Sequence, residues 1–152
     1  MSVYYLDTSA LVKFYVREPG TERMLRLADP AGGHTFAVLG LARVEFRAAV
    51  RLRERTGDVT REVADRLIHS LDDHLGNTYL IQPITDLVIG EAVALLDRHI
   101  LRAYDAVQLA GFILLRARLG RQATFVCSDR QLLKAAEDEG LTTLDPVAEA
   151  RA

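Results

Sequence analysis

Short apolar runs alternate along this chain with longer segments in which apolar residues recur every three or four positions. The short runs are rich in β-branched and aromatic residues, which is typical of buried strands. We expect strands at residues 3–6, 35–39, 78–81, 123–127 and 141–144. The longer segments predict a helix that starts at Ala10 and further helices at residues 21–28, 41–55, 60–75, 85–99, 103–119 and 130–139. Alternating strands and helices indicate a three-layer α/β/α sandwich around a mostly parallel sheet of about five strands.

Length and composition narrow the class of protein. The 152 residues predict a single domain over 1–152, and a hydrophobic content of 49% argues against disorder. No apolar run approaches the roughly 18 residues that cross a bilayer, and the N-terminus lacks the pattern of a signal peptide. The single Cys127 excludes an internal disulfide framework and a cysteine-cluster metal site. We therefore expect a cytoplasmic protein without a membrane partner.

The charge balance is nearly neutral. A formal net charge of −2 gives no global basic field of the kind that many nucleic-acid binders carry, although local distribution matters more. Of the 19 cationic residues only Lys13 and Lys134 are lysines. Arginine suits bidentate phosphate contacts, but a genome rich in G and C would produce the same bias.

Two carboxylates directly follow predicted strands. Asp7 follows the run 3–6 and precedes two hydroxyl residues and a helix. Asp129 repeats the order of strand, carboxylate and helix after the run 123–127. Ligands of open parallel sheets collect at the carboxyl ends of strands. Both residues are therefore candidate site residues, with a helix-capping role for Asp7 as the structural alternative.

Two further carboxylates lie on helices that must pack over the sheet. Glu45 shares a face with Leu41, Ala48, Ala49 and Leu52, which we take as the packed face. A glutamate there is costly unless it is paired or bound to metal, and an ion pair with an arginine is the structural alternative. Asp105 falls in the first turn of a very apolar helix, where a capping role would also suit the helix dipole.

Together these four acids, without histidines at metal-like spacing, indicate a site for a hard cation. Oxygen ligands suit Mg²⁺ or Mn²⁺, which polarise phosphoryl groups and activate water for in-line attack. Other acids have weaker claims, and Asp72 and Asp73 at a polar helix end are expected to be solvated.

At these residues the sequence resembles PIN-domain ribonucleases, more closely the VapC-type toxins of type II toxin–antitoxin modules. The likeness covers essentially the whole chain, and the order and spacing of the four acids carry it. The matching stretches are residues 5–13, 44–45, 101–110 and 125–133, continuing to 140–141 and 145–146.

The resemblance implies a role for each of these residues. Asp7, Glu45, Asp105 and Asp129 would form the metal-binding and catalytic quartet, with Ser9 as a hydrogen-bonding residue within the site. The family often has Thr or Ser two residues before the last acid, where this chain has Cys127, so Ser128 is the candidate for the missing hydroxyl. The thiol itself is expected to pack as a small hydrophobe without a catalytic role.

The resulting functional hypothesis is a Mg²⁺- or Mn²⁺-dependent endoribonuclease that cuts single-stranded or looped RNA. The resemblance also implies an antitoxin that blocks the site and a homodimer built on apolar helix faces. Arginines spaced four apart could hold RNA phosphates, although a solvated or salt-bridged helix face is an equal alternative. These arginines are Arg43, Arg47, Arg51 and Arg55.

Two other functions are open at this point. One is a receiver-like or ligand-binding α/β domain that uses Asp7 for a metal ion and cuts no RNA. It would want adjacent acids after the first strand and an acid at the end of the third, whereas Thr8 and Gln82 stand there. The other is a catalytically silent PIN scaffold, against which the complete set of four acids argues.

Overall fold

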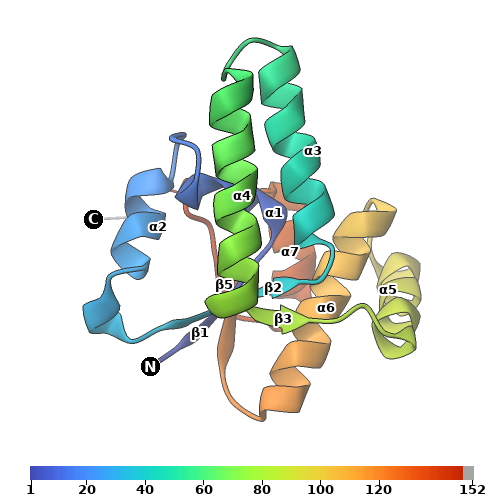
Figure 1. Ribbon diagram of the computed structural model, residues 1–152. Coiled ribbons are helices and arrows are strands. Elements are labelled where there is room, and N and C mark those ends of the chain that lie inside the picture. Colours follow the sequence, from blue (N-terminus) through green and yellow to red (C-terminus); the bar gives the residue numbers. More distant parts are fainter. Residues whose placement is uncertain (149–152) are drawn as a thin grey trace.

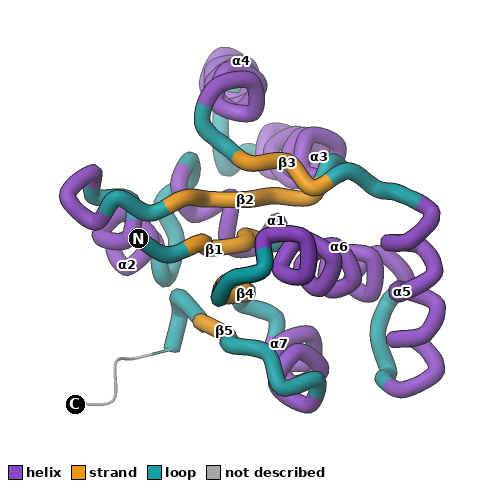
Figure 2. Tube along the Cα trace, turned by 90° about the horizontal axis from the view of Figure 1, so that it is seen from below, coloured by secondary structure: helices purple, strands orange, loops and turns teal. Residues whose placement is uncertain are grey.

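A five-stranded parallel sheet lies at the centre of the structure, a computed structural model that describes residues 1–148 (Figure 1). The sheet order is β3-β2-β1-β4-β5, as Figure 2 shows from edge to edge. This order differs from the 2-1-3-4-5 order of receiver-like domains. The strands are β1 (Val3–Leu6), β2 (Thr35–Leu39), β3 (Leu80–Gln82), β4 (Ala123–Val126) and β5 (Thr143–Leu144).

The register aligns the strand ends that precede two of the predicted site acids. Leu6 at the end of β1 pairs with Val38 of β2 on one side and with Val126 of β4 on the other. The chain therefore leaves β1 and β4 at the same level of the sheet. Asp7 directly follows β1, and Asp129 follows β4 after two residues.

Helices cover both faces of the sheet, as the alternating pattern predicts. Short 3₁₀ turns occupy Val12–Phe14 and Pro30–Gly32. Within residues 1–148, no helix is both long and apolar enough to cross a bilayer. The α-helices are α1 (Thr8–Leu11), α2 (Thr21–Leu27), α3 (Ala42–Arg55), α4 (Arg61–Asn77), α5 (Asp86–Arg98), α6 (Ala103–Leu119) and α7 (Arg130–Asp138).

Two hydrophobic cores flank the sheet and confirm the three-layer sandwich. Under α5, α6 and α7, the rings of Tyr5, Phe112 and Phe125 pack with centroids 5.3 to 5.8 Å apart. On the opposite face, Leu6 and Phe46 belong to the core formed with α1 to α4. Burial of this apolar surface is the main stabilising contribution to the fold.

The connection from α4 to β3 differs from the prediction. Helix α4 continues through Gly76 and Asn77, where we expected a turn, and the strand that follows is Leu80–Gln82 instead of 78–81. The side chain of Asn77 donates to the carbonyl of Asp73 (2.9 Å), and this hydrogen bond stabilises the last turn of the helix. The predicted turn is therefore two residues too early.

The predicted packed face of α3 was wrong. The buried residues of this helix are Ala42, Phe46 and Val50, whereas Leu52 is 61% exposed. The predicted stripe and the stripe of Ala42, Phe46 and Val50 are both apolar at helical spacing. The second one is buried, and the aromatic side chain of Phe46 fills the core. The stripe with Leu41, Ala48 and Glu45 instead faces a cavity at the end of the sheet.

Candidate active site

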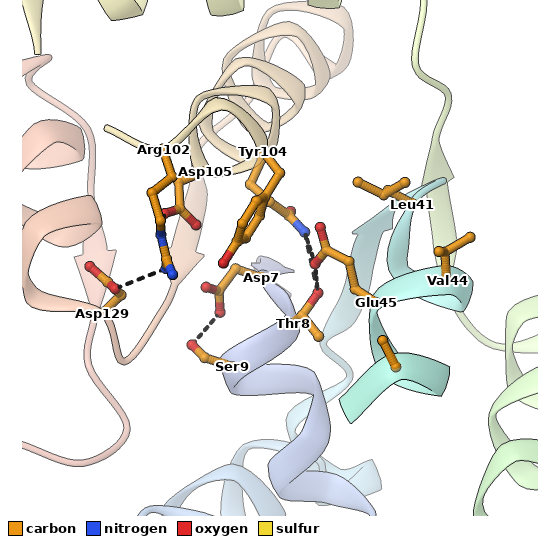
Figure 3. A pocket seen from close by; sticks show the side chains of 12 residues that line it. Asp7, Thr8, Ser9, Leu41, Val44, Glu45, Arg102, Tyr104, Asp105 and Asp129 are labelled. Atoms are coloured by element: carbon orange, nitrogen blue, oxygen red, sulfur yellow. Dashed lines mark hydrogen bonds and ion pairs between the residues drawn. The ribbon is translucent and has the colours of Figure 1, made fainter. Parts of the chain in front are cut away.

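All four predicted acids line one cavity of about 480 Å³ (Figure 3). Asp7 comes from the end of β1 and Asp129 from the loop after β4, while Glu45 and Asp105 come from the first turns of α3 and α6. Four separate elements thus direct carboxylates toward one space. This arrangement follows from the aligned carboxyl ends of β1 and β4 and from the placement of two helix N-termini beside them.

Asp7 is the most constrained of the four acids. Its Oδ1 atom accepts hydrogen bonds from the hydroxyl of Ser9 (2.7 Å) and the backbone N–H of Ala10 (3.0 Å), so it caps α1 as well as lining the cavity. Only 6% of the residue is exposed. Burial raises the pKa of Asp7 to about 6, against the hydrogen bonds, and the negative charge of Glu45 adds to the increase. The capping role and the site role therefore coexist.

Glu45 is held by neutral donors. Its Oε2 atom accepts from the hydroxyl of Thr8 (Figure 3) and from Nε2 of Gln108 (3.1 Å). The arginine ion pair of the structural alternative is not what holds it. Its other oxygen, Oε1, is buried and has no hydrogen-bond partner among the described residues. A buried carboxylate oxygen without a partner is costly, and it marks a place for a bound cation or its water.

Gln108 is a site residue that sequence reasoning missed. It is 2% exposed and lies one turn after Asp105 on α6, where its Oε1 atom accepts from the hydroxyl of Tyr5 (3.3 Å). A Cβ atom at Gly111 would lie 2.6 Å from that hydroxyl, so only glycine leaves room for the tyrosine. The signal in the sequence is an amide in the middle of an otherwise apolar helix.

Arg102 and Tyr104 complete the cavity and were also missed. The Nε atom of Arg102 donates to Oδ2 of Asp105 (2.8 Å), and one terminal nitrogen lies 3.6 Å from Oδ2 of Asp129. The guanidinium also stacks over Tyr104, 4.9 Å from the ring centroid. Burial raises the pKa of Asp105, and the ion pair with Arg102 opposes that increase.

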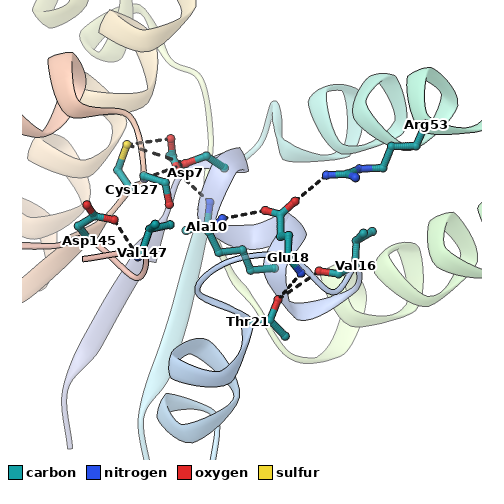
Figure 4. Close-up of polar contacts among 12 residues, drawn as sticks. Asp7, Ala10, Val16, Glu18, Thr21, Arg53, Cys127, Asp145 and Val147 are labelled. Atoms are coloured by element: carbon teal, nitrogen blue, oxygen red, sulfur yellow. Dashed lines mark hydrogen bonds and ion pairs between the residues drawn. The ribbon is translucent and has the colours of Figure 1, made fainter. Parts of the chain in front are cut away.

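Cys127 takes the place of the hydroxyl that we expected from Ser128. Its thiol donates to Oδ2 of Asp7 (3.1 Å; Figure 4), and the backbone N–H of Asp129 donates to its sulfur (3.2 Å). The hydroxyl of Ser128 is buried without a hydrogen-bond partner among the described residues, and its backbone N–H donates to Ser9 (3.0 Å). Burial first, and the charge of Asp7 next, raise the pKa of the Cys127 thiol far above its usual range.

The arginines spaced four apart on α3 (Arg43, Arg47, Arg51 and Arg55), here called the arginine stripe, do not line the cavity, and three of them pair with acids. Arg43 donates to Asp72 (2.9 Å), and Arg47 lies 3.7 Å from the same carboxylate. Arg51 pairs with Glu54 and with Asp65 of α4, at 2.6 Å each. Asp72, which we expected to be solvated, is therefore an ion-pair partner between α3 and α4. These contacts favour the salt-bridged helix face that the sequence left open.

The donor set of the cavity fits a divalent cation. All four candidate ligands offer oxygen, the Oε1 atom of Glu45 lacks a partner, and Asp7 is buried beside a second negative charge. Within residues 1–148, however, no three acidic, histidine or cysteine side chains are already grouped as a metal centre. The carboxylates would have to close around an ion.

Comparison with known proteins identifies the family, although no family model matches the chain. Ribonuclease VapC47 from Mycobacterium tuberculosis (strain CDC 1551 / Oshkosh) is 34% identical over 147 residues, which cover 95% of this chain and 97% of that protein. Ribonuclease VapC46 from M. tuberculosis (strain H37Rv) is 30% identical over 146 residues, covering 96% and 99%.

Solved structures show the same fold at lower identity. The crystal structure of VapBC2 from Rickettsia felis, bound to a DNA fragment from its promoter, matches with a TM-score of 0.64 at 16% identity and covers 94% of this chain and 98% of that one. VapBC-1 from nontypeable Haemophilus influenzae matches with a TM-score of 0.62 at 13% identity, covering 96% and 99%. The fold is PIN-like, and by its full-length likeness to the two mycobacterial proteins the chain belongs to the VapC ribonuclease family.

Proposed function

We propose that this protein is a metal-dependent endoribonuclease and the toxin of a toxin–antitoxin module. One observation carries the proposal: in a member of the VapC family, four separate elements direct carboxylates to one cavity at the carboxyl end of the sheet. A receiver-like domain would not need all four. A silent scaffold would not need to keep Asp7 ionisable in a buried position, where its charge is costly.

Asp7, Glu45, Asp105 and Asp129 are the residues that would hold Mg²⁺ or Mn²⁺. Such a cation, when bound, lowers the pKa of water and offsets negative charge on a phosphodiester under attack. No side chain of the cavity needs to act as a nucleophile. The Cys127 thiol is protonated at neutral pH, and the Ser9 hydroxyl is committed to Asp7.

The protein's own contribution is to orient Asp7 and Glu45 before substrate arrives. Ser9 and Cys127 each hold one oxygen of Asp7, and Thr8 and Gln108 hold one oxygen of Glu45. The remaining oxygen of Glu45 stays available in the cavity. Groups that are already oriented do not have to reorganise during the reaction, which lowers the barrier.

A small antitoxin and a second copy of the chain are the proposed partners, in the cytoplasm. The VapBC name of the two structural neighbours supports the antitoxin. Exposed apolar side chains on α5, such as Leu87 (72%) and Val93 (57%), are candidates for the homodimer face. A monomer in light scattering at micromolar concentration would contradict the dimer.

The chemistry of the cleaved ends tests the proposed reaction. In-line attack by water that displaces the 3′ oxygen leaves 5′-phosphate and 3′-hydroxyl ends. Attack by the neighbouring 2′-hydroxyl leaves a 2′,3′-cyclic phosphate instead. We expect end-labelling and mass spectrometry of the fragments to give the first pair, with cleavage stopped by a chelator and restored by Mg²⁺ or Mn²⁺. Cyclic phosphate ends, or cleavage in chelator, would overturn the proposal.

A further inference from the structure

Among residues 1–148, the lining of the cavity has four acids and one cation, and that cation is Arg102. An RNA phosphate that enters this space meets repulsion from every carboxylate that is not neutralised. Arg102 offsets part of this repulsion, because its guanidinium lies beside the carboxylates of Asp105 and Asp129 (Figure 3). It is therefore the natural first contact for an incoming anion.

The backbone and two neighbours fix the position of this side chain. Arg102 is the residue directly before α6, with extended backbone angles (φ −71°, ψ 153°), so its place relative to Asp105 is set by the start of the helix. The Nε–H group is committed to Asp105, and the aromatic ring of Tyr104 supports the plane of the guanidinium. Its orientation at the cavity rim is thus determined before any ligand binds.

The terminal nitrogens of Arg102 are left available. Of the five N–H groups of a guanidinium, the structure commits only the one on Nε to a hydrogen bond within residues 1–148. The contact to Asp129, at 3.6 Å, is longer than a hydrogen bond, and the side chain is 63% exposed. An ion pair this exposed is weak, so exchanging Asp129 for a phosphate oxygen costs little.

The arginines of α3 do not offer the same opportunity. Arg43 and Arg51 are paired with acids of α4, and neither lines the cavity with the four carboxylates. Arg102 combines position in the cavity, unused donors and exposure. A guanidinium can bind two phosphate oxygens at once, and it stays charged throughout the working pH range.

We propose that Arg102 is a substrate-binding residue that contacts the phosphate of the RNA bond to be cut, while its Nε–H group stays on Asp105. The inference rests on the proposed ribonuclease function and deepens it. Arg102 transfers no proton in this role. It binds the phosphate in the ground state and stabilises the additional negative charge on the phosphate oxygens during attack.

The test compares Arg102→Ala, Arg102→Gln and Arg102→Lys with Arg98→Ala, an exposed arginine of α5 that pairs with Glu91 and Glu139 outside the cavity. Affinity for a labelled single-stranded RNA is measured over a range of salt concentrations in an Asp7→Asn background, which keeps the RNA intact. Cleavage is measured separately, in single turnover at saturating RNA, with Asp7 restored. Melting temperatures confirm that the variants fold. Arg102→Gln is included because its amide can still donate a hydrogen bond to Asp105 after the charge is removed.

We expect Arg102→Ala and Arg102→Gln to raise Kd about fivefold or more and to reduce the slope of log K against log salt by about 0.7, the value for one single-strand phosphate contact. Arg102→Lys should keep the slope and lose part of the affinity. Saturated cleavage should slow about tenfold or more in the Ala and Gln variants. Arg98→Ala should match the parent protein.

Two results would overturn the inference alone: an RNA-cleaving protein in which Arg102→Ala leaves the salt slope unchanged, or one in which Kd rises but saturated cleavage keeps its rate. The second result would assign Arg102 to binding the RNA equally before and during attack, and not to the phosphate of the bond to be cut. Absence of metal-dependent cleavage by the unaltered protein would instead overturn the proposed function, and this inference with it.

Discussion

The sulfur of Cys127 lies 3.1 Å from Oδ2 of Asp7, and through the N–H of Asp129 it also holds the loop that carries the last acid of the site. One buried thiol therefore links the loops that follow β1 and β4. Its hydrogen bonds are those that a hydroxyl would make, with the longer reach of sulfur. The thiol thus contacts two of the acid-bearing segments, and we expect it to take no part in the chemistry itself.

Replacement of Cys127 should distinguish a hydrogen-bonding role of this side chain from a chemical role of its thiol. Cys127→Ser keeps a donor and an acceptor, so we expect RNA cleavage within a few-fold of the parent rate. Cys127→Val fills a similar volume but leaves Oδ2 of Asp7 with one donor fewer, and we expect about 1–3 kcal/mol lower stability and clearly slower cleavage. Resistance of native activity to iodoacetamide is the accompanying check. Loss of activity in the serine variant alone would indicate a thiol mechanism.

Asp7→Asn should abolish cleavage and stabilise the metal-free protein. Because the pKa of Asp7 rises from 3.8 to about 6 on folding, ionisation of Asp7 costs stability as pH rises through this interval. At pH 8 the cost is on the order of 2–3 kcal/mol, and the asparagine variant escapes it. Melting curves in chelator at pH 5 and pH 8 measure the effect. A variant that melts below the parent at pH 8 would contradict this electrostatic explanation.

Gln108 should act on the reaction through Glu45. Gln108→Leu keeps the side-chain volume but removes the donor to Oε2 of Glu45, and we expect cleavage to fall about 10- to 100-fold, the range for supporting residues of metal ligands. The apparent Mn²⁺ affinity, measured without RNA, should fall as well. Gln122→Leu, at an exposed position before β4, is the matched control. Unchanged Mn²⁺ affinity in Gln108→Leu would remove Gln108 from the site.

The arginine stripe should prove to stabilise the α3–α4 pair. We expect Arg43→Ala with Arg47→Ala to cost about 1 kcal/mol of stability, less at high salt, and Asp72→Asn to reproduce the loss. The salt dependence of RNA binding should stay as in the parent. A smaller slope of log K for RNA against log salt in the double variant, with unaltered stability, would instead assign these arginines to RNA binding.

Much of this fold and the position of the four acids can be read from the sequence, because each rests on local pattern. Asp7 and Asp129 end predicted strands, and parallel strands in register bring such ends together. The packed face of α3 could not be read in the same way, because Phe46 and Leu41 head two apolar stripes of the same periodicity. Only the core decides which stripe is buried.

The supporting contacts escape sequence reasoning for a different reason. Gln108 holds Glu45 across 63 positions, and Cys127 holds Asp7 across 120. No periodicity or spacing reports such pairs, and their residue types are ordinary ones. Arg102 stands three residues before Asp105, a spacing that also suits an unremarkable surface ion pair. Only the folded structure shows that Arg102 also lies beside Asp129, between two of the predicted site acids.

The central claim is that the four carboxylates act as one metal-dependent cleavage site. The most direct measurement is the rate of RNA cleavage in Mg²⁺ by a matched set of variants: Asp7→Asn, Glu45→Gln, Asp105→Asn, Asp129→Asn and, as the control, Asp138→Asn on the exposed side of α7. We predict losses of about 100-fold or more for each of the first four. The control should keep the parent rate, and chelator should abolish cleavage throughout. Full activity in any one of the four, or cleavage that persists in chelator, would contradict the account.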